Sequence, residues 1–175
     1  MGGVSDLAPL CTPEPLAARH DVSRFANAAH PSLDQWLRDY ARSSEGYSAR
    51  TYVVCPVAEP DRVVGYFSIA TATEERNILP SAKLRRGMPV QIPLLLIGRL
   101  AVDVEWQQRG LGSALLADAV RRCVAASAIA GIRGVVAHAI DEMAAAFYES
   151  HGFLRSPLGE RVMLMPIETA RALVG

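Results

Sequence analysis

The chain has few cysteines, no long apolar run and no net charge, and each lack excludes a class of protein. The three cysteines, Cys11, Cys55 and Cys123, are odd in number and widely spaced, which is unlike a disulfide framework or a metal site. No apolar run reaches the roughly 18 residues of a membrane span. Residues 1–7 have neither a basic start nor a continuous apolar core, so they do not predict a signal peptide. The sequence therefore predicts a cytoplasmic protein with no membrane segment and no metal.

The charges balance, because 18 basic and 18 acidic residues leave a formal net charge of zero. Composition therefore gives no bulk basic signature of a nucleic-acid binder. Every basic residue except Lys83 is an arginine. Arginine favours bidentate phosphate contacts, but genomic base composition produces the same bias. The length of 175 residues, 50% of them hydrophobic, predicts a single domain over residues 1–175.

The order of apolar patterns predicts an α+β domain with a mixed sheet of six or seven strands. Residues 1–15 carry three prolines and should form an extended lead-in. A helix should begin at Ser32 with a capping box, and Asp34 should lie on its solvated face. Asp141 should cap a later helix, which Gly152 should end. Strands are expected at residues 50–57, 63–71, 92–102, 132–139 and 161–166, a helix at 111–124, a short helix or turns at 16–29, and loops at 43–49 and 73–91.

The segment Gln107-Gln108-Arg109-Gly110-Leu111-Gly112-Ser113 has the pattern Gln-x-x-Gly-x-Gly, between an apolar run and a helical pattern. Glycines let the backbone approach a ligand, and the unpaired amides of a first helical turn favour an anion such as a pyrophosphate. The segment is not a Walker loop, because no lysine follows Gly112. It is not a dinucleotide fingerprint, because Leu115 stands where a third glycine would be. A plain strand-to-helix turn is the other alternative.

Three segments occur in the order and spacing of a known family: Ile97-Gly98-Arg99-Leu100-Ala101-Val102-Asp103, the Gln-x-x-Gly-x-Gly turn, and Ala146-Phe147-Tyr148-Glu149-Ser150-His151-Gly152-Phe153. Together they resemble the GNAT acetyltransferase superfamily, over about residues 51–166. Further segments, at residues 33–37 with Ala41 and at 64–68, 98–103 and 136–142, give a narrower resemblance. It is to the acetyltransferase toxins of bacterial toxin–antitoxin pairs, which acetylate the free amine of aminoacyl-tRNA.

The resemblance implies a GNAT fold, in which a mixed, mostly antiparallel sheet of six to seven strands splays at its central strands and carries flanking helices. It implies acetyl-CoA as the acetyl donor. The pantetheine arm would pair with the backbone of Leu100, Ala101 and Val102, where one amide would stabilise the oxyanion of the tetrahedral intermediate. The pyrophosphate would lie on the turn, whose residues are Gln107, Gln108, Arg109, Gly110, Leu111, Gly112 and Ser113.

Tyr148 is the residue that the family motif makes the general acid, which would protonate the CoA thiolate as it leaves. The alternative is that Phe147 and Tyr148 are adjacent packing aromatics, and of the two Phe147 is the expected core residue. His138 is expected to be a satisfied core or cleft histidine, and Cys123 a core residue. No carboxylate stands out as a general base. An α-amine has a pKa near ~8, about two units below that of a lysine side chain, so a strong base is dispensable.

The candidates for RNA contact are basic residues of the 73–91 loop and of the first clear helix: Arg76, Lys83, Arg85, Arg86, Arg38 and Arg42. Between Arg76 and Arg99 there are five basic residues and no acidic one. Such a patch would bind the phosphates of an acceptor stem without reading sequence. A solvated loop and the binding of an acidic antitoxin segment are the alternatives. The resemblance further implies a homodimer and a partner antitoxin, by family analogy a small ribbon-helix-helix DNA-binding protein.

The leading hypothesis is therefore an N-acetyltransferase toxin that transfers acetyl from acetyl-CoA to the α-amine of aminoacyl-tRNA and so blocks translation. Two alternatives stay open. One is an acetyltransferase of a small-molecule amine or a protein N-terminus. The other is a non-catalytic, regulatory module that binds CoA without turnover.

Overall fold

The structure, a computed structural model, describes residues 8–175. The lack of a signal peptide predicted for residues 1–7, and the first part of the expected lead-in, fall outside the described residues. In the second part of the lead-in, Glu14–Pro15 forms a short strand, β1, which pairs antiparallel with β2 (Arg50–Val54). Residues 16–29 form turns and no helix. Within residues 8–175, none of the helices has the length and apolar character that a membrane crossing needs.

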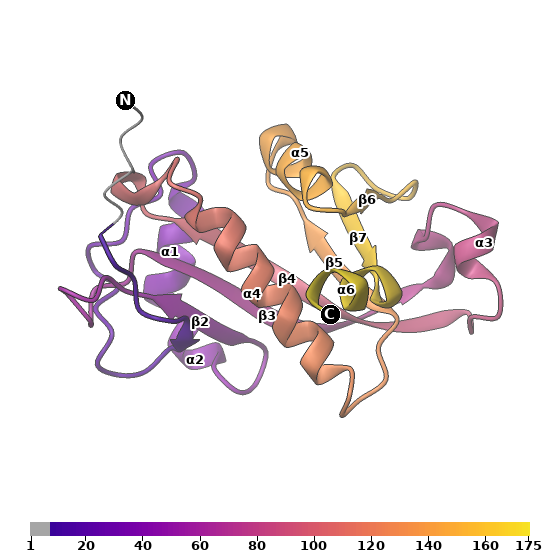
Figure 1. Cartoon of the computed structure of the whole chain (residues 1–175), viewed down its shortest axis with the longest axis horizontal. Coiled ribbons are helices and arrows are strands. Elements are labelled where there is room, and N and C mark those ends of the chain that lie inside the picture. Colours follow the sequence, from indigo (N-terminus) through magenta and orange to yellow (C-terminus); the bar gives the residue numbers. More distant parts are fainter. Residues whose placement is uncertain (1–7) are drawn as a thin grey trace. The chain divides into compact units, whose positions relative to one another are not determined.

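Seven strands form one mixed sheet in the order β1-β2-β3-β4-β5-β7-β6 (Figure 1). Strands β4 and β5 pair in parallel, whereas β5 with β7 and β6 with β7 are antiparallel. The predicted α+β fold is confirmed. The other strands are β3 Gly65–Glu75, β4 Gln91–Val102, β5 Gly134–His138, β6 Leu154–Arg155 and β7 Val162–Pro166; the helices are α1 Pro31–Asp39, α2 Ala41–Ser44, α3 Ala82–Arg85, α4 Leu111–Ala126, α5 Glu142–Ser150 and α6 Ile167–Val174, with 3-10 turns η1 Arg76–Ile78 and η2 Val104–Trp106.

The chain divides into two compact units, and the divisions fall within β3, β4 and α4. One core cluster lies in the first unit, around Phe25, Leu37 and Tyr66, which are 1%, 0% and 0% exposed. Phe25 meets Tyr66 edge to face at 5.5 Å, and the Tyr66 hydroxyl donates to the carbonyl of Leu33 at 2.7 Å. The first unit is the chain up to Ser68 with Arg99–Leu116, and the second is Ile69–Gly98 with Ala117–Gly175.

Helix α1 begins one residue before the predicted start at Ser32, which is therefore wrong. Pro31 is its first residue, and the N-cap residue His30 makes no side-chain cap. Proline suits this position, because its fixed φ is helical and its missing amide would have had no helical acceptor. The placement of Asp34 on a solvated face is also wrong. Asp34 is 7% exposed and accepts a hydrogen bond from the amide of Asn27 at 2.8 Å.

Two expected loops contain regular structure. The 43–49 segment starts inside α2, and in the 73–91 segment β3 runs on to Glu75 and is followed by η1 and α3. The amide of Arg76 donates to the carbonyl of Val90 at 2.7 Å, so main-chain pairing continues past the end of β3. In the second unit, α5 and α6 both pack against β7 (Figure 1). Helix α6 was not predicted, because it is short and no side chain caps its start.

Candidate active site

The Gln-x-x-Gly-x-Gly segment forms a tight turn between η2 and α4. Two of its residues have left-handed backbone, Gln108 with a φ of 60° and Gly110 with a φ of 82°. Glycine adopts this conformation readily, and the space that a Cβ on Gly110 would occupy is empty to 4 Å. The guanidinium of Arg109 lies 5.1 Å from the ring centroid of Trp106. The turn therefore presents exposed backbone and one stacked cation to open space.

Helix α4 begins at this turn, and the amides before its hydrogen-bond ladder have no helical acceptor. The amide of Ala114 donates to the carbonyl of Gly110 at 3.1 Å. The amides of Gly110, Leu111 and Gly112 come earlier in the chain, so no carbonyl four residues back lies in the helix for them. The positive end of the helix dipole is also here. In charge and in available donors, these residues fit the pyrophosphate of a nucleotide-like ligand.

Gly65 in β3 lets α4 approach the sheet. An added Cβ on Gly65 would lie 2.9 Å from Cδ1 of Leu115 and 2.9 Å from Cγ1 of Val54, with Cδ2 of Leu111 at 3.4 Å. A protein core has no spare volume for such a methyl group. Leu111 and Leu115 are 7% and 1% exposed. The missing side chain at Gly65 therefore sets how deeply the first turns of α4 are seated.

Hydrogen bonds from the buried Asn27 and Asp103 and the half-buried Gln107 hold the start of the turn. Nε2 of Gln107 donates to the carbonyls of Asn27 at 2.9 Å and Val102 at 3.0 Å, and Nδ2 of Asn27 donates to the same Val102 carbonyl at 3.0 Å. Asp103 is 2% exposed and accepts from the amide of Ala26 at 3.1 Å. Asn27 was missed as a site residue. No local pattern could have found it, because its partner Val102 is 75 residues away in the sequence.

The end of β4 carries the three residues predicted to pair with pantetheine. Leu100 is half-buried, and Ala101 and Val102 are buried. The backbone amide of Asp103 donates to the carbonyl of Val64, the residue before β3, at 2.8 Å. Backbone groups alternate in direction along a strand, so Ala101 faces the same way as Asp103, and Leu100 and Val102 face the opposite way. The last described pair of β4 with β5 is at Ile97, so all three residues follow the end of that parallel pairing.

Helix α5 carries Tyr148, and both of its predicted ends are confirmed. The side chain of Asp141 accepts from an amide of the first turn at 2.8 Å, and Gly152 follows the helix with a φ of 93°. Tyr148 is 6% exposed and Phe147 is half-buried, so the expectation that Phe147 is the core residue of the pair is wrong. The phase of α5 directs Tyr148 toward Phe153, and their ring centroids are 5.2 Å apart.

The Tyr148 hydroxyl has no hydrogen-bond partner within residues 8–175. Burial raises the pKa of Tyr148 to about 12, because the phenolate would lose its hydration. The phenol therefore keeps its proton at neutral pH, which is the form a general acid needs.

Other predicted residues have simpler positions. His138 is exposed at the end of β5 and so is not a core histidine. Cys123 is buried, as predicted, and Cys11 and Cys55 are free thiols like Cys123. Over the described residues, no three His, Cys, Asp or Glu side chains gather in an arrangement that would hold a metal ion.

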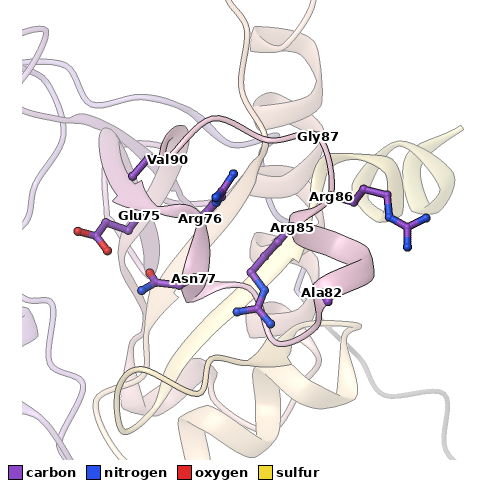
Figure 2. A pocket seen from close by; sticks show the side chains of 8 residues that line it. All are labelled: Glu75, Arg76, Asn77, Ala82, Arg85, Arg86, Gly87 and Val90. Atoms are coloured by element: carbon purple, nitrogen blue, oxygen red, sulfur yellow. The ribbon is translucent and has the colours of Figure 1, made fainter.

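The basic loop surrounds a pocket of about 660 Å³ (Figure 2). Three predicted RNA contacts, Arg76, Arg85 and Arg86, lie at this pocket, whereas Lys83 is exposed outside its lining. Nη1 of Arg76 and Nε of Arg85 donate to main-chain carbonyls of the loop at 2.8 and 3.2 Å. These bonds hold the two guanidinium groups and leave other N–H donors for an anion. The full lining is Glu75, Arg76, Asn77, Ala82, Arg85, Arg86, Gly87 and Val90.

Arg38 and Arg42 are exposed, yet both also serve the fold. Nη1 of Arg38 donates to the carbonyl of Phe25 at 3.2 Å, and the Arg42 guanidinium donates to the carbonyl of His20. Each arginine thus ties α1 or α2 to the turns before them. Part of their hydrogen-bonding capacity is used within the protein.

A ligand with a pyrophosphate and a peptide-like arm would find a partner for each along one stretch of chain, from the end of β4 to the start of α4. This combination suits CoA thioesters, and the class is that of a CoA-dependent acyltransferase. A family model described as "Acetyltransferase (GNAT) domain" matches residues 49–155. The chain belongs to the GNAT acetyltransferase family, and its acetyl donor is acetyl-CoA. The predicted family, enzyme class and donor are confirmed.

Individual relatives give a narrower likeness. The chain is 37% identical over 164 residues to the tRNA-acetylating toxin of Mycobacterium tuberculosis (strain ATCC 25618 / H37Rv), across 93% of this chain and 96% of the relative. It is similar to AtaT complexed with acetyl-methionyl-tRNAfMet, with a TM-score of 0.87 and 30% identity over 95% of this chain and 100% of that one. It is also similar to a mutant AtaT toxin bound to the C-terminus of the antitoxin AtaR and to acetyl-CoA, with a TM-score of 0.79 and 28% identity over 94% and 98%.

Proposed function

We propose that the protein transfers the acetyl group of acetyl-CoA to the free α-amine of aminoacyl-tRNA and thereby blocks translation. The observation that carries the proposal is the 37% identity to a tRNA-acetylating toxin over 93% of this chain and 96% of the relative. A likeness of this extent includes the regions outside the donor motif, which choose the acceptor. AtaT, whose fold is similar, is complexed with an aminoacyl-tRNA that carries the acetyl group.

In this proposal the turn from Gln107 to Ser113 holds the pyrophosphate of acetyl-CoA. The amides of its glycines and of Leu111 donate to the phosphate oxygens, Arg109 adds a charge-assisted contact, and Gln107 and Gln108 shape the turn. The pantetheine arm pairs with the end of β4. Leu100 supplies its backbone groups and Val102 its backbone amide, since both face away from β3. The Val102 carbonyl is already taken by Asn27 and Gln107. Ala101 lies between the two residues.

We propose the following steps for the acetyl transfer. The amine lone pair attacks the thioester carbonyl carbon, and a backbone amide at the end of β4 stabilises the oxyanion that forms. The C–S bond then breaks, and Tyr148 gives its proton to the departing thiolate sulfur. The proton that the amine loses goes to water, because the pKa of an α-amine lies near ~8 and a strong base is unnecessary. Tyr148 regains a proton from solvent.

The basic pocket is the part of the surface best suited to the tRNA. We propose that Arg76, Arg85 and Arg86 bind phosphates of the acceptor stem, with Lys83 on the same loop. Arg38 and Arg42 are weaker candidates, because the fold already uses part of their donors. Contacts of this kind are independent of sequence and weaken as the salt concentration rises.

We also propose that a cognate antitoxin neutralises the enzyme. The support is that AtaT is bound to the C-terminus of the antitoxin AtaR. The antitoxin would be a small ribbon-helix-helix protein, the enzyme would be a homodimer, and both would act in the cytoplasm, where charged tRNA is found. Co-purification of the two proteins and light scattering of the free enzyme test these points.

The direct experiment is incubation with charged tRNA and labelled acetyl-CoA. Label on the aminoacyl group is the expected result, and no label with any charged tRNA would refute the proposal. Label on small amines or protein N-termini would favour another acetyltransferase, and binding of acetyl-CoA without turnover would favour a regulatory module.

Arg86 has no partner within the described chain, so Arg86→Glu should raise the KM for tRNA and leave the affinity for acetyl-CoA unchanged.

A further inference from the structure

The carbonyl of Val102, the last residue of β4, is held by two side-chain donors. Nδ2 of Asn27 and Nε2 of Gln107 each lie 3.0 Å from it. A carbonyl oxygen has two lone pairs, so this one is fully used. Val102 is 9% exposed, and a buried bond of this kind is costly to lose. The peptide plane that ends the strand therefore has a fixed orientation.

Asn27 is itself fixed, because every polar group it has is engaged. Its backbone amide donates to Oδ1 of Asp34 at 2.8 Å, and its side-chain Oδ1 accepts from the backbone amide of His30 at 3.1 Å. Its carbonyl accepts from Nε2 of Gln107 at 2.9 Å. Asn27 is 8% exposed. Hydrogen bonds at both Nδ2 and Oδ1 thus hold the side chain in place next to the strand end.

We infer that Asn27 is a positioning residue for acetyl-CoA. It connects the two places where the donor is held: its side chain fixes the end of β4 through Val102, and its main chain fixes the start of the glycine turn through Gln107. The spacing between the pantetheine-pairing strand end and the pyrophosphate turn is then set before the ligand arrives. Preorganised donors bind more tightly, because no ordering is left to be done on binding. The inference rests on the proposed function for the location of acetyl-CoA, and is independent of the acceptor.

A purely structural role for Asn27 would have a different kinetic signature. A variant that only folds less well has fewer active molecules, so kcat per total enzyme falls and the KM for acetyl-CoA stays the same. A variant with a loosened strand end and turn stays folded, and its KM and dissociation constant for the CoA moiety rise. The split between the two constants separates the roles.

The test is Asn27→Asp, which keeps the size and the acceptor for the His30 amide. It replaces the Nδ2 donor with an oxygen that faces the carbonyl of Val102. Calorimetry with CoA should show a dissociation constant about tenfold larger than that of the wild type, as expected for the loss of one buried hydrogen bond. Tyr66→Phe is the matched control. It removes another buried hydrogen bond of the same unit, to Leu33, and should leave CoA binding unchanged.

An unchanged dissociation constant in folded Asn27→Asp overturns the inference. If that variant does not fold, Gln107→Met removes the donor that joins Asn27 to Val102 at a half-buried position. Gln107→Met should weaken CoA binding by a similar factor. Unchanged binding in this variant would equally overturn the inference. Because CoA binding needs no acceptor, wild-type enzyme that fails to acetylate charged tRNA would refute the proposed function and leave this comparison intact.

Discussion

Replacing Tyr148 with phenylalanine removes only the hydroxyl group that would donate a proton in the proposed reaction. The hydroxyl has no partner within residues 8–175, and a phenylalanine ring can keep the contacts with Phe147 at 5.6 Å and Phe153 at 5.2 Å. The free energy of unfolding should therefore not fall, because no hydrogen bond within residues 8–175 is lost and a buried unpaired hydroxyl is removed. Loss of a general acid typically lowers the rate by ~10²- to 10⁴-fold. We expect kcat to fall by that factor while the affinity for CoA stays within about twofold.

The assay measures initial rates of acetyl transfer at saturating acetyl-CoA, with calorimetry of CoA and urea unfolding on the same samples. Tyr47→Phe is the matched control, because Tyr47 is 93% exposed and should show no change in any measurement. A kcat for Tyr148→Phe within about threefold of wild type would remove Tyr148 from the acid role.

The pH profile tests the same reasoning independently. An acid must be protonated to act, and burial raises the pKa of Tyr148 to about 12. Tyr148 should therefore cause no loss of rate below about pH 10, two units under that pKa. The rate should rise as the α-amine deprotonates near pH ~8 and then level off. A decline below about pH 10 that Tyr148→Phe abolishes would contradict the burial argument.

Three further predictions concern stability and the donor site. Gly65→Ala should lower the free energy of unfolding by about 1–3 kcal/mol and weaken CoA binding, because the new methyl group meets Leu115 at 2.9 Å; calorimetry and urea unfolding check both. Ala28 has a φ of 75°, so Ala28→Gly should stabilise the protein by up to about 1 kcal/mol in urea unfolding. Burial raises the pKa of Cys55 to about 11 and of Cys123 to about 12, above about 8.5 for an unfolded thiol. The free energy of unfolding should thus have its full value below about pH 8.5, where the thiols are protonated in both states. It should decline as the pH rises toward 12, and less steeply in Cys123→Ala.

Each of these predictions has an outcome that contradicts it. Unchanged stability of Gly65→Ala would mean that α4 is not held at the depth described. A less stable Ala28→Gly would mean that the entropy of the unfolded chain outweighs the relief of the left-handed backbone. An unfolding free energy that is level from pH 9 to 12 would mean that both thiols ionise as easily in the folded protein as in the unfolded chain.

The parts of the fold that depend on local chemistry could be predicted from the sequence. Asp141 and Gly152 act within one helical turn of their own positions, so the ends of α5 were found. The apolar run that forms β4 was found because most of its middle residues are buried, and such a strand has apolar side chains on both faces. The glycine turn was found because its left-handed backbone at Gly110 favours glycine at that position.

The parts that depend on distant contacts could not be predicted. Asp34 is buried because Asn27 donates to it, and nothing near Asp34 in the sequence indicates this. Which of Phe147 and Tyr148 points inward depends on the rotation of α5, and this rotation is set by packing against β6 and β7. Because Phe147 and Tyr148 are adjacent on α5, a shift of one residue in the buried face of the helix decides which ring points inward. The acceptor side is harder still, because an exposed arginine has the same sequence pattern whether it binds RNA or solvent.

The two tryptophans of the chain, Trp36 and Trp106, each lie beneath an arginine. The guanidinium of Arg99 is 4.4 Å from the ring centroid of Trp36, and that of Arg109 is 5.1 Å from Trp106. A cation over an indole ring alters its electronic environment, and only Arg109 belongs to the glycine turn. We expect Arg109 to turn toward an arriving anion. The Trp106 ring would then lose its cation and its fluorescence would change, while Trp36 would keep Arg99. Tryptophan fluorescence would therefore report the arrival of an anion at the glycine turn, and Trp36→Phe would leave Trp106 as the only tryptophan in the chain.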